Sequence, residues 1–158
     1  MNNLSESASR VQNILDEKNI PLEIVKFETT THTAQQAADT IGCDVAQILK
    51  SLVFVKKPSM ELFLIAASGK NRVNTKTLKK YFGEKVTPAD PQDILEKTGY
   101  AVGGVPPIGH IEPLLTLIDS DLLEYDALWA SGGSAYEVFK ISPQQLLDIT
   151  GGTVLDIK

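Results

Sequence analysis

The sequence is poor in the residues and segments that mark secreted, membrane and disulfide-bonded proteins. It has one cysteine, Cys43, which excludes an internal disulfide and favours a reducing cytosol. The first residues lack the apolar core of a secretion signal, and no hydrophobic run reaches the length of a bilayer-spanning helix. We therefore expect a cytoplasmic protein that does not associate with membranes.

The usual side-chain machinery of hydrolases and metalloenzymes is also missing. The sequence has no Gly-x-Ser-x-Gly motif, no useful metal-ligand spacing and no plausible Cys–His pair. No cation or histidine flanks Cys43 to activate its thiol, so we interpret it as a small packed residue. We expect neither a metal nor a cofactor.

The composition is that of a soluble globular protein. The chain has 158 residues, of which 42% are hydrophobic and 22% are charged. A chain of this length can bury a sizeable core in a single domain. Because no repeat, linker or low-complexity tract interrupts it, we expect one domain over residues 1–158.

Positive charge is concentrated in one part of an acidic chain. The formal net charge is −5, but residues 50–85 carry nine Lys and Arg against two Glu, which is +7 and leaves −12 for the remainder. A local basic field can steer a polyanion toward an acidic protein. Nucleic acid is therefore the leading partner, and the alternative is an ordinary solvated surface rich in lysine.

Helix signals and strand patterns are mixed without regular βαβ order. Caps and apolar spacing predict helices over 5–19, 34–41, 75–82, 91–98 and 143–149. Strands are predicted over 22–27, 51–56, 61–67, 114–119, 127–130, 137–141 and 154–157. The strands 51–56 and 61–67 should form a central hairpin, and 131–134 a flexible turn. These elements predict an α/β or mixed α+β fold, in which helices flank a curled mixed β-sheet.

The most unusual stretch is the loop from Gly99 to His110, which holds four glycines and two prolines. Glycine permits positive φ and close approach of a ligand, whereas proline fixes φ and removes an N–H donor. Such a loop can aim backbone amides at an anion or a carbonyl oxygen; the alternative is a tight connection between strands. It is not a P-loop, because His110 stands where lysine is required, and its glycine spacing does not fit a Rossmann fingerprint.

Several motifs occur together along the chain: His32-Thr33-Ala34 before an alanine-rich helix, Lys50 opening a Leu-Val-Phe-Val strand, Ser68-Gly69 before Arg72-Val73, the Gly99–His110 loop, and Gly132-Gly133 before Glu-Val-Phe-Lys-Ile. Over nearly its whole length the chain thereby resembles the YbaK/prolyl-tRNA synthetase-associated domain family of editing domains. That family often has aspartate after the Arg-Val pair, where this chain has Asn74. We interpret Asn74 as a change of helix cap.

The resemblance implies an enzyme that hydrolyses the ester joining a small amino acid to the terminal adenosine of a mischarged tRNA. The expected substrate is tRNA(Pro) carrying alanine or cysteine, and prolyl-tRNA synthetase is an expected partner. An aminoacyl ester is already activated, so hydrolysis needs an oriented water and donors for the oxyanion rather than a strong nucleophile. That demand agrees with the missing nucleophile motifs.

The resemblance also implies roles for particular residues. Lys50 would hold the substrate through a phosphate or ribose contact. Gly103 and Gly104 would supply backbone contacts to the oxyanion or substrate, and His110 would either orient water or only hold the loop. The other expected substrate contacts are His32, Thr33, Gly109, Gly132 and Gly133, and the expected tRNA contacts are Lys70, Arg72, Lys76, Lys79 and Lys80.

Two other classes of function stay open at this point. One is a tRNA-binding or regulatory module of the same fold that has no catalytic activity. The other is a hydrolase of unrelated small esters or amides. The residues do not distinguish among alanine, cysteine and serine or threonine as the amino acid removed, and they leave the oligomeric state open.

Overall fold

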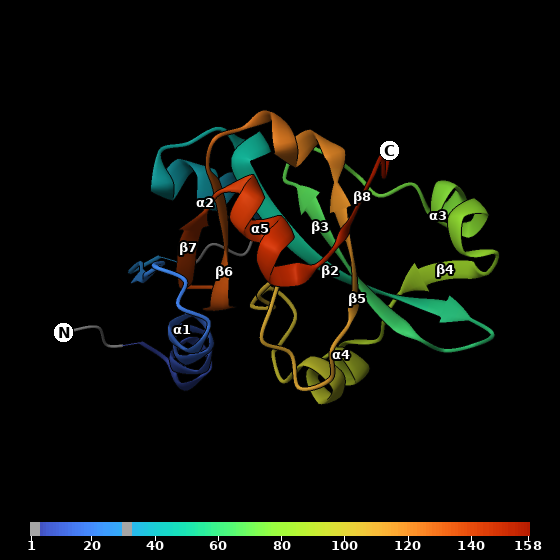
Figure 1. The fold of residues 1–158 in the computed structure, drawn as a ribbon, viewed down its shortest axis with the longest axis horizontal. Coiled ribbons are helices and arrows are strands. Elements are labelled where there is room, and N and C mark those ends of the chain that lie inside the picture. Colours follow the sequence, from blue (N-terminus) through green and yellow to red (C-terminus); the bar gives the residue numbers. More distant parts are fainter. Residues whose placement is uncertain (1–3, 30–32) are drawn as a thin grey trace.

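The described strands all belong to one mixed sheet, which helices flank (Figure 1). The computed structural model describes residues 4–29 and 33–158. The strands are β1 (Ile24–Lys26), β2 (Ile48–Lys57), β3 (Leu62–Ser68), β4 (Lys85–Pro88), β5 (Leu115–Asp119), β6 (Leu128–Ser134), β7 (Glu137–Ile141) and β8 (Thr153–Leu155). The helices are α1 (Glu6–Glu17), α2 (Ala34–Ile41), α3 (Thr75–Phe82), α4 (Pro91–Thr98) and α5 (Pro143–Thr150), with 3-10 turns η1 (Val45–Gln47) and η2 (Ser120–Glu124).

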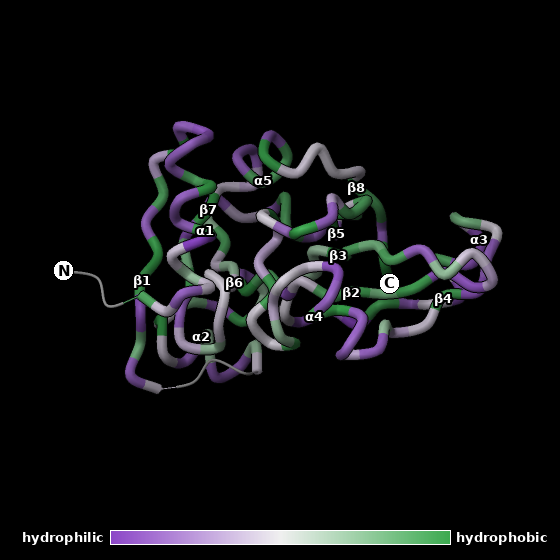
Figure 2. The backbone as a smooth tube through the Cα atoms, turned by 90° about the horizontal axis from the view of Figure 1, so that it is seen from below, coloured by the Kyte–Doolittle hydropathy of each residue, from purple (hydrophilic) through white to green (hydrophobic). Residues whose placement is uncertain are grey.

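The hairpin of β2 and β3 forms the centre of the sheet, as the sequence predicts. The strand order is β1-β7-β6-β2-β3-β5-β8, and β4 pairs with β2 outside that path. Strands β2 and β3 pair antiparallel, whereas β2 with β6 and β3 with β5 pair parallel. Figure 2 shows the two central strands as largely hydrophobic, with the more hydrophilic α3 at one end of the molecule. The predicted mixed sheet is confirmed.

The helices begin and end at the residues whose local chemistry predicts it. Thr33 accepts a hydrogen bond from the backbone N–H of Gln36 at 3.0 Å, and the side chain of Gln36 accepts one from the N–H of Thr33. Asn74 caps α3, because its side chain accepts hydrogen bonds from the next turn. Gly42 ends α2 in the left-handed conformation at φ +85°.

Several parts of the sheet differ from the sequence prediction. Residues 131–134 are not a flexible turn: they continue β6 as far as Ser134 and pair with β7 through a register irregularity between Ser131 and Ser134. The bulge accommodates the two glycines within the strand. Strand β4 has no counterpart in the prediction, and β2 begins at Ile48, so that Lys50 lies inside the strand rather than at its mouth.

The glycine-rich loop exposes residues 101–103 but is anchored in the main hydrophobic core by three buried side chains. Its side chains Tyr100, Val105 and Ile108 are buried in one cluster with residues of α1, β6 and β7. A second cluster lies beneath α3, around Phe63 and Leu78. Within residues 4–29 and 33–158, none of the helices combines the length and apolar character that a membrane crossing requires.

Candidate functional site

An opening in the sheet lies along one edge of β2. On that edge β2 pairs with β6 at Ile48 and Leu49, and with β4 from Phe54 onward. The backbone carbonyl of Val53 points to this edge, because it accepts a hydrogen bond from the N–H of Ala89. In a strand the N–H and C=O groups of every second residue point to the same edge, so those of Ser51 point the same way as those of Val53. The N–H and C=O of Ser51 therefore face the opening, where the register of the described strands pairs them with no residue.

A cavity of about 440 Å³ occupies this opening. Its walls come from β2, the first turn of α2, the start of α4, the glycine-rich loop and β6, and most of them are apolar. The lining residues are Thr33, Ala34, Ile48, Lys50, Ser51, Leu52, Val53, Phe54, Pro88, Ala89, Pro91, Ile94, Val102, Gly103, Val105 and Ser131. Lys50 is the single cation among these lining residues.

Lys50 is half-buried and its ammonium is held in place. Its Nζ donates a hydrogen bond to the backbone carbonyl of Asn71 at 2.9 Å. Burial lowers the pKa of Lys50 below its ordinary value, the neighbouring Arg72 lowers it further, and Asp119 opposes both effects. Because an ammonium has three N–H donors, two remain for a ligand in the cavity.

The two central glycines of the loop have different environments. Gly103 lines the cavity and has φ +90°, a conformation that a side chain would strain. Gly104 is buried, and its N–H donates to the carbonyl of Ala101 at 2.9 Å within the loop. A Cβ on Gly104 would lie 2.9 Å from the backbone oxygen of Gly133. Gly104 therefore packs the loop against β6, while Gly103 stands where a backbone contact with substrate is possible.

His110 and Gly109 attach the end of the loop to the core. Nε2 of His110 lies 2.7 Å from the carbonyl oxygen of Pro106 and must donate to it. Burial lowers the pKa of His110, although this hydrogen bond opposes the shift. A Cβ on Gly109 would approach Ile14 of α1 to 2.8 Å. Neither residue belongs to the lining that the described residues give the cavity.

The wall formed by β6 contributes Ser131 rather than the glycine pair after it. Gly133 has φ +115°, and a Cβ there would lie 2.9 Å from the backbone nitrogen of Ala8, so this glycine lets α1 approach the strand. Gly132 is buried beside Ile24 of β1. Ser131 immediately precedes the pair and was missed, although its position next to the predicted pocket glycines could have indicated it.

Ser51 is a second residue that the sequence prediction missed. Within the described part of the chain, its buried Oγ has no hydrogen-bond partner. Buried hydroxyls are nearly always bonded, so this one is a candidate for a ligand contact. Thr33, which the sequence analysis predicts to contact substrate, lines the cavity. His32 lies outside the described residues.

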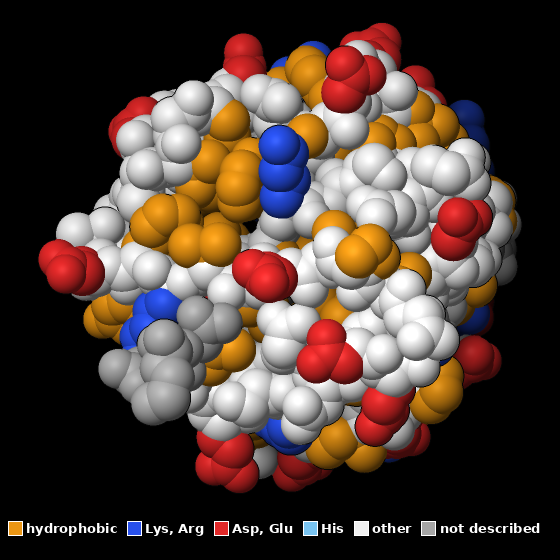
Figure 3. Space-filling view, turned by 60° about the vertical axis from the view of Figure 1, so that its left-hand side comes forward, with side chains coloured by type: hydrophobic (Ala, Val, Ile, Leu, Met, Phe, Trp, Pro, Cys, Tyr) orange, Lys and Arg blue, Asp and Glu red, His pale blue; other side chains and the backbone are white. Residues whose placement is uncertain are grey.

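The five lysines and arginines predicted to bind tRNA are all exposed. Lys70 and Arg72 lie in the loop before α3, and Arg72 is close enough to Lys50 to affect its charge. Lys76, Lys79 and Lys80 lie on α3, at the far end of the molecule from α1 (Figure 1). The face turned forward in Figure 3 carries a hydrophobic patch among scattered acidic side chains. The three lysines of α3 thus lie at one end of the molecule, whereas Lys70 and Arg72 lie on the segment that leads to it from β3.

Fold and site together define the class of protein. A mixed-sheet domain holds a lysine-bearing apolar cavity beneath a glycine-rich loop, and residues 4–29 and 33–158 contain no cluster of three His, Cys, Asp or Glu that could hold a metal ion. The chain belongs to the aminoacyl-tRNA editing domain family, whose model matches residues 28–149.

Three relatives illustrate this membership. A crystal structure described as a candidate trans-editing enzyme for prolyl tRNA synthetase is 41% identical, with a TM-score of 0.93 and coverage of 99% of both chains. An Enterococcus faecalis protein whose name proposes a Cys-tRNA(Pro)/Cys-tRNA(Cys) deacylase is 23% identical over 97% of this chain and 94% of its own. The proline–tRNA ligase of Limosilactobacillus fermentum is 32% identical over 63% of this chain, which corresponds to 18% of the ligase.

Proposed function

We propose that this protein is a deacylase that hydrolyses the ester of mischarged tRNA, with tRNA(Pro) carrying alanine or cysteine as its substrate. The observation that carries the proposal is a half-buried lysine that lines a mostly apolar cavity and whose ammonium is held by the Asn71 carbonyl. The names of the relatives support tRNA(Pro) as the carrier. A volume of about 440 Å³ is at the small end for ligand sites, which favours a small aminoacyl group.

The proposed reaction adds water to the ester and releases the free amino acid and a tRNA with a free terminal hydroxyl. Lys50 binds a phosphate or ribose oxygen of the terminal adenosine, and the backbone at Gly103 contacts the carbonyl that becomes the oxyanion. The described lining of the cavity contains no carboxylate, imidazole or thiol that could act as a base. The neighbouring ribose hydroxyl of the substrate therefore orients the water.

The walls of the cavity select the amino acid by size and polarity. Leu52, Phe54 and Ile94 present apolar surface on the side where β4 and α4 meet β2. A charged side chain would lose its hydration there without compensation. The cavity of about 440 Å³ has to hold part of the terminal adenosine as well as the amino acid, which limits the size of the amino acid's side chain.

The test is a deacylation assay on tRNA(Pro) charged in turn with alanine, cysteine, serine and proline. We expect release of alanine or cysteine at least tenfold faster than release of proline, because one or two methylenes in a close-fitting pocket give roughly this discrimination. Binding of tRNA without release of any amino acid would identify a non-catalytic module. Hydrolysis of simple esters without any preference for aminoacyl-tRNA would identify a small-molecule hydrolase.

A further inference from the structure

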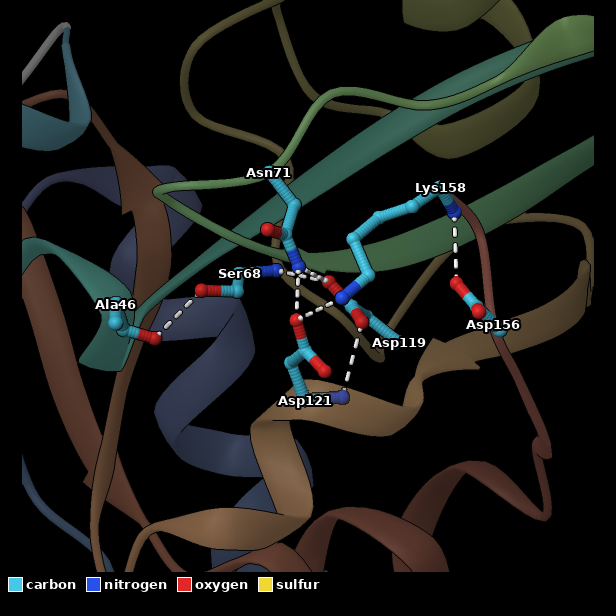
Figure 4. A network of polar contacts seen from close by, with 7 residues as sticks. All are labelled: Ala46, Ser68, Asn71, Asp119, Asp121, Asp156 and Lys158. Atoms are coloured by element: carbon cyan, nitrogen blue, oxygen red, sulfur yellow. Dashed lines mark hydrogen bonds and ion pairs between the residues drawn. The ribbon is translucent and has the colours of Figure 1, made fainter.

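A polar network centred on Asn71, Asp119 and Asp121 (Figure 4) is connected to Lys50 through the backbone of Asn71. The backbone carbonyl of Asn71 accepts the hydrogen bond from Lys50 Nζ. The side-chain Nδ2 of the same Asn71 donates to Oδ2 of Asp119 and to Oδ2 of Asp121, at 2.8 Å each. Asn71 thus connects the Lys50 ammonium to the carboxylate of Asp119 at the end of β5 and to that of Asp121 in η2.

Asp119 is the fixed end of this network. Its side chain is completely buried, and it accepts hydrogen bonds from the N–H of Ser68 at 3.0 Å and of Asp121 at 3.0 Å, besides the bond from Asn71. A buried carboxylate is tolerated only when such donors compensate its lost hydration. The hydroxyl of Ser68 in turn donates to the carbonyl of Ala46 at 2.8 Å. Strands β3 and β5 and the turn η1 are therefore joined at one point.

The segment that carries the acceptor for Lys50 has little regular structure of its own. Residues 69–74 form the connection between β3 and α3. Within this connection, the side chain of Asn71 donates two hydrogen bonds that attach the segment to the end of β5 and the start of η2. A lysine side chain has a flexible four-carbon stem, so its ammonium is placed only if its acceptor is placed.

We propose that Asn71 and Asp119 are positioning residues for Lys50. They hold the acceptor carbonyl rigid, so that the ammonium is aligned in the cavity before substrate arrives, and the charge of Asp119 favours the protonated form of Lys50 against its burial. This proposal rests on the proposed deacylase function, but part of its test does not depend on activity.

The kinetic test is a double-mutant cycle on single-turnover deacylation with Asn71→Ala, Lys50→Ala and the double variant. Asn71→Ala should lower the maximal rate by about 10- to 100-fold, as expected when a reactive group moves by about 1 Å. In the Lys50→Ala background the same change should alter the rate by less than about twofold, since the two residues act as one unit. In both single variants, the maximal rate and the half-saturating enzyme concentration should change in the same proportion to each other.

The control is Ser142→Ala, which removes the N-cap of α5 and perturbs folding without touching the cavity. We expect it to lower the melting temperature and leave the deacylation rate unchanged. If Asn71→Ala behaved like this control, or if its loss were the same with and without Lys50, the positioning role would be refuted.

The second readout is the side-chain NMR signal of the Lys50 ammonium, identified by its disappearance in Lys50→Ala. In the wild type its protons should exchange slowly with water, because they are hydrogen-bonded and half-buried. In folded Asn71→Ala the signal should merge with those of exposed lysines. An unchanged Lys50 signal would overturn the proposal even if the protein proved to have no deacylase activity, whereas a vanished signal in an inactive protein would support the positioning and refute only the function.

Discussion

Replacing Lys50 by alanine tests the central residue of the cavity. The substitution removes a half-buried ammonium whose position is fixed by the Asn71 carbonyl and which has two N–H donors left for substrate. A hydrogen bond from a charged group contributes about 1.5–3 kcal/mol. If the contact forms mainly in the transition state, its loss slows single-turnover deacylation roughly 10- to 150-fold.

Lys56→Ala provides the matched control on the same strand. The side chain of Lys56 is mostly buried, and Lys56 lies six residues from Lys50, hence on the same face of β2. Its ammonium pairs with Glu61 at 3.7 Å and lies 4.7 Å from the ring centroid of Phe82, away from the cavity. Lys56→Ala should therefore cost stability and leave the rate at the wild-type level. Equal deacylation rates for the wild type and Lys50→Ala would refute the assignment of the site.

The same residue predicts a pH dependence of stability. The pKa of Lys50 is lowered in the folded protein, so the unfolded chain binds this proton more tightly than the native state does. Lys50 therefore destabilises the fold at neutral pH, and this cost disappears as the pH rises through the lowered pKa toward the ordinary value of 10.5. Lys50→Met should raise the melting temperature at pH 7, and the gain should shrink toward pH 10. A gain that grew with pH would contradict the argument.

Three further predictions concern the loop and the basic end of the protein. In Gly104→Ala the added Cβ would lie 2.9 Å from the backbone of β6. Overpacking of this kind costs about 1–3 kcal/mol, so the melting temperature should fall by about 2–12 °C. An unchanged melting temperature would show that the loop does not need this close contact. Changing Lys76, Lys79 and Lys80 to Glu should weaken tRNA binding. The slope of log binding constant against log salt concentration should become shallower by about 0.7–0.9 for each phosphate that is no longer neutralised. Unchanged affinity in a filter-binding assay would exclude α3 from the tRNA interface. Because the pKa of His110 is lowered in the folded protein, the free energy of unfolding should fall as the pH drops below 6.5. The variant His110→Gln can still donate to Pro106, and it should reduce this loss of stability in thermal unfolding between pH 5 and 7.5. The same loss of stability in the variant would show that other groups cause it.

The features that the sequence predicts correctly depend on chemistry within a few residues. Thr33 with Gln36, and Ser142 with Gln145, form capping boxes whose donors and acceptors are three residues apart. Gly42 and Gly99 end their helices for the same local reason, since each adopts a positive φ. Lys50 can also be recognised as unusual from the sequence alone, because charged residues are rare beside the apolar residues of a buried strand. These signals need no knowledge of the tertiary fold.

The features that were missed or mistaken depend on residues far apart in the chain. Strand β4 is four residues long and is defined by its pairing with β2, about thirty positions earlier. The glycines of 131–134 indicate a turn when read locally, whereas pairing with β7 makes them part of β6. Ser51 and Ser131 line the same cavity because β6 and β4 pair with separate parts of one edge of β2 and leave a gap between them.

The polar groups of this site belong to the backbone as much as to side chains, which explains why few polar side chains line it. The acceptor that holds Lys50 is a main-chain carbonyl, which every residue type offers, so only the side-chain contacts of Asn71 make position 71 specific. The N–H and C=O of Ser51 face the opening of the sheet for a reason of register, not of residue identity. A hydrolase acting on an activated ester needs orientation more than nucleophilic power. In the proposed reaction, a sheet edge with one fixed ammonium supplies that orientation without a recognisable nucleophile motif.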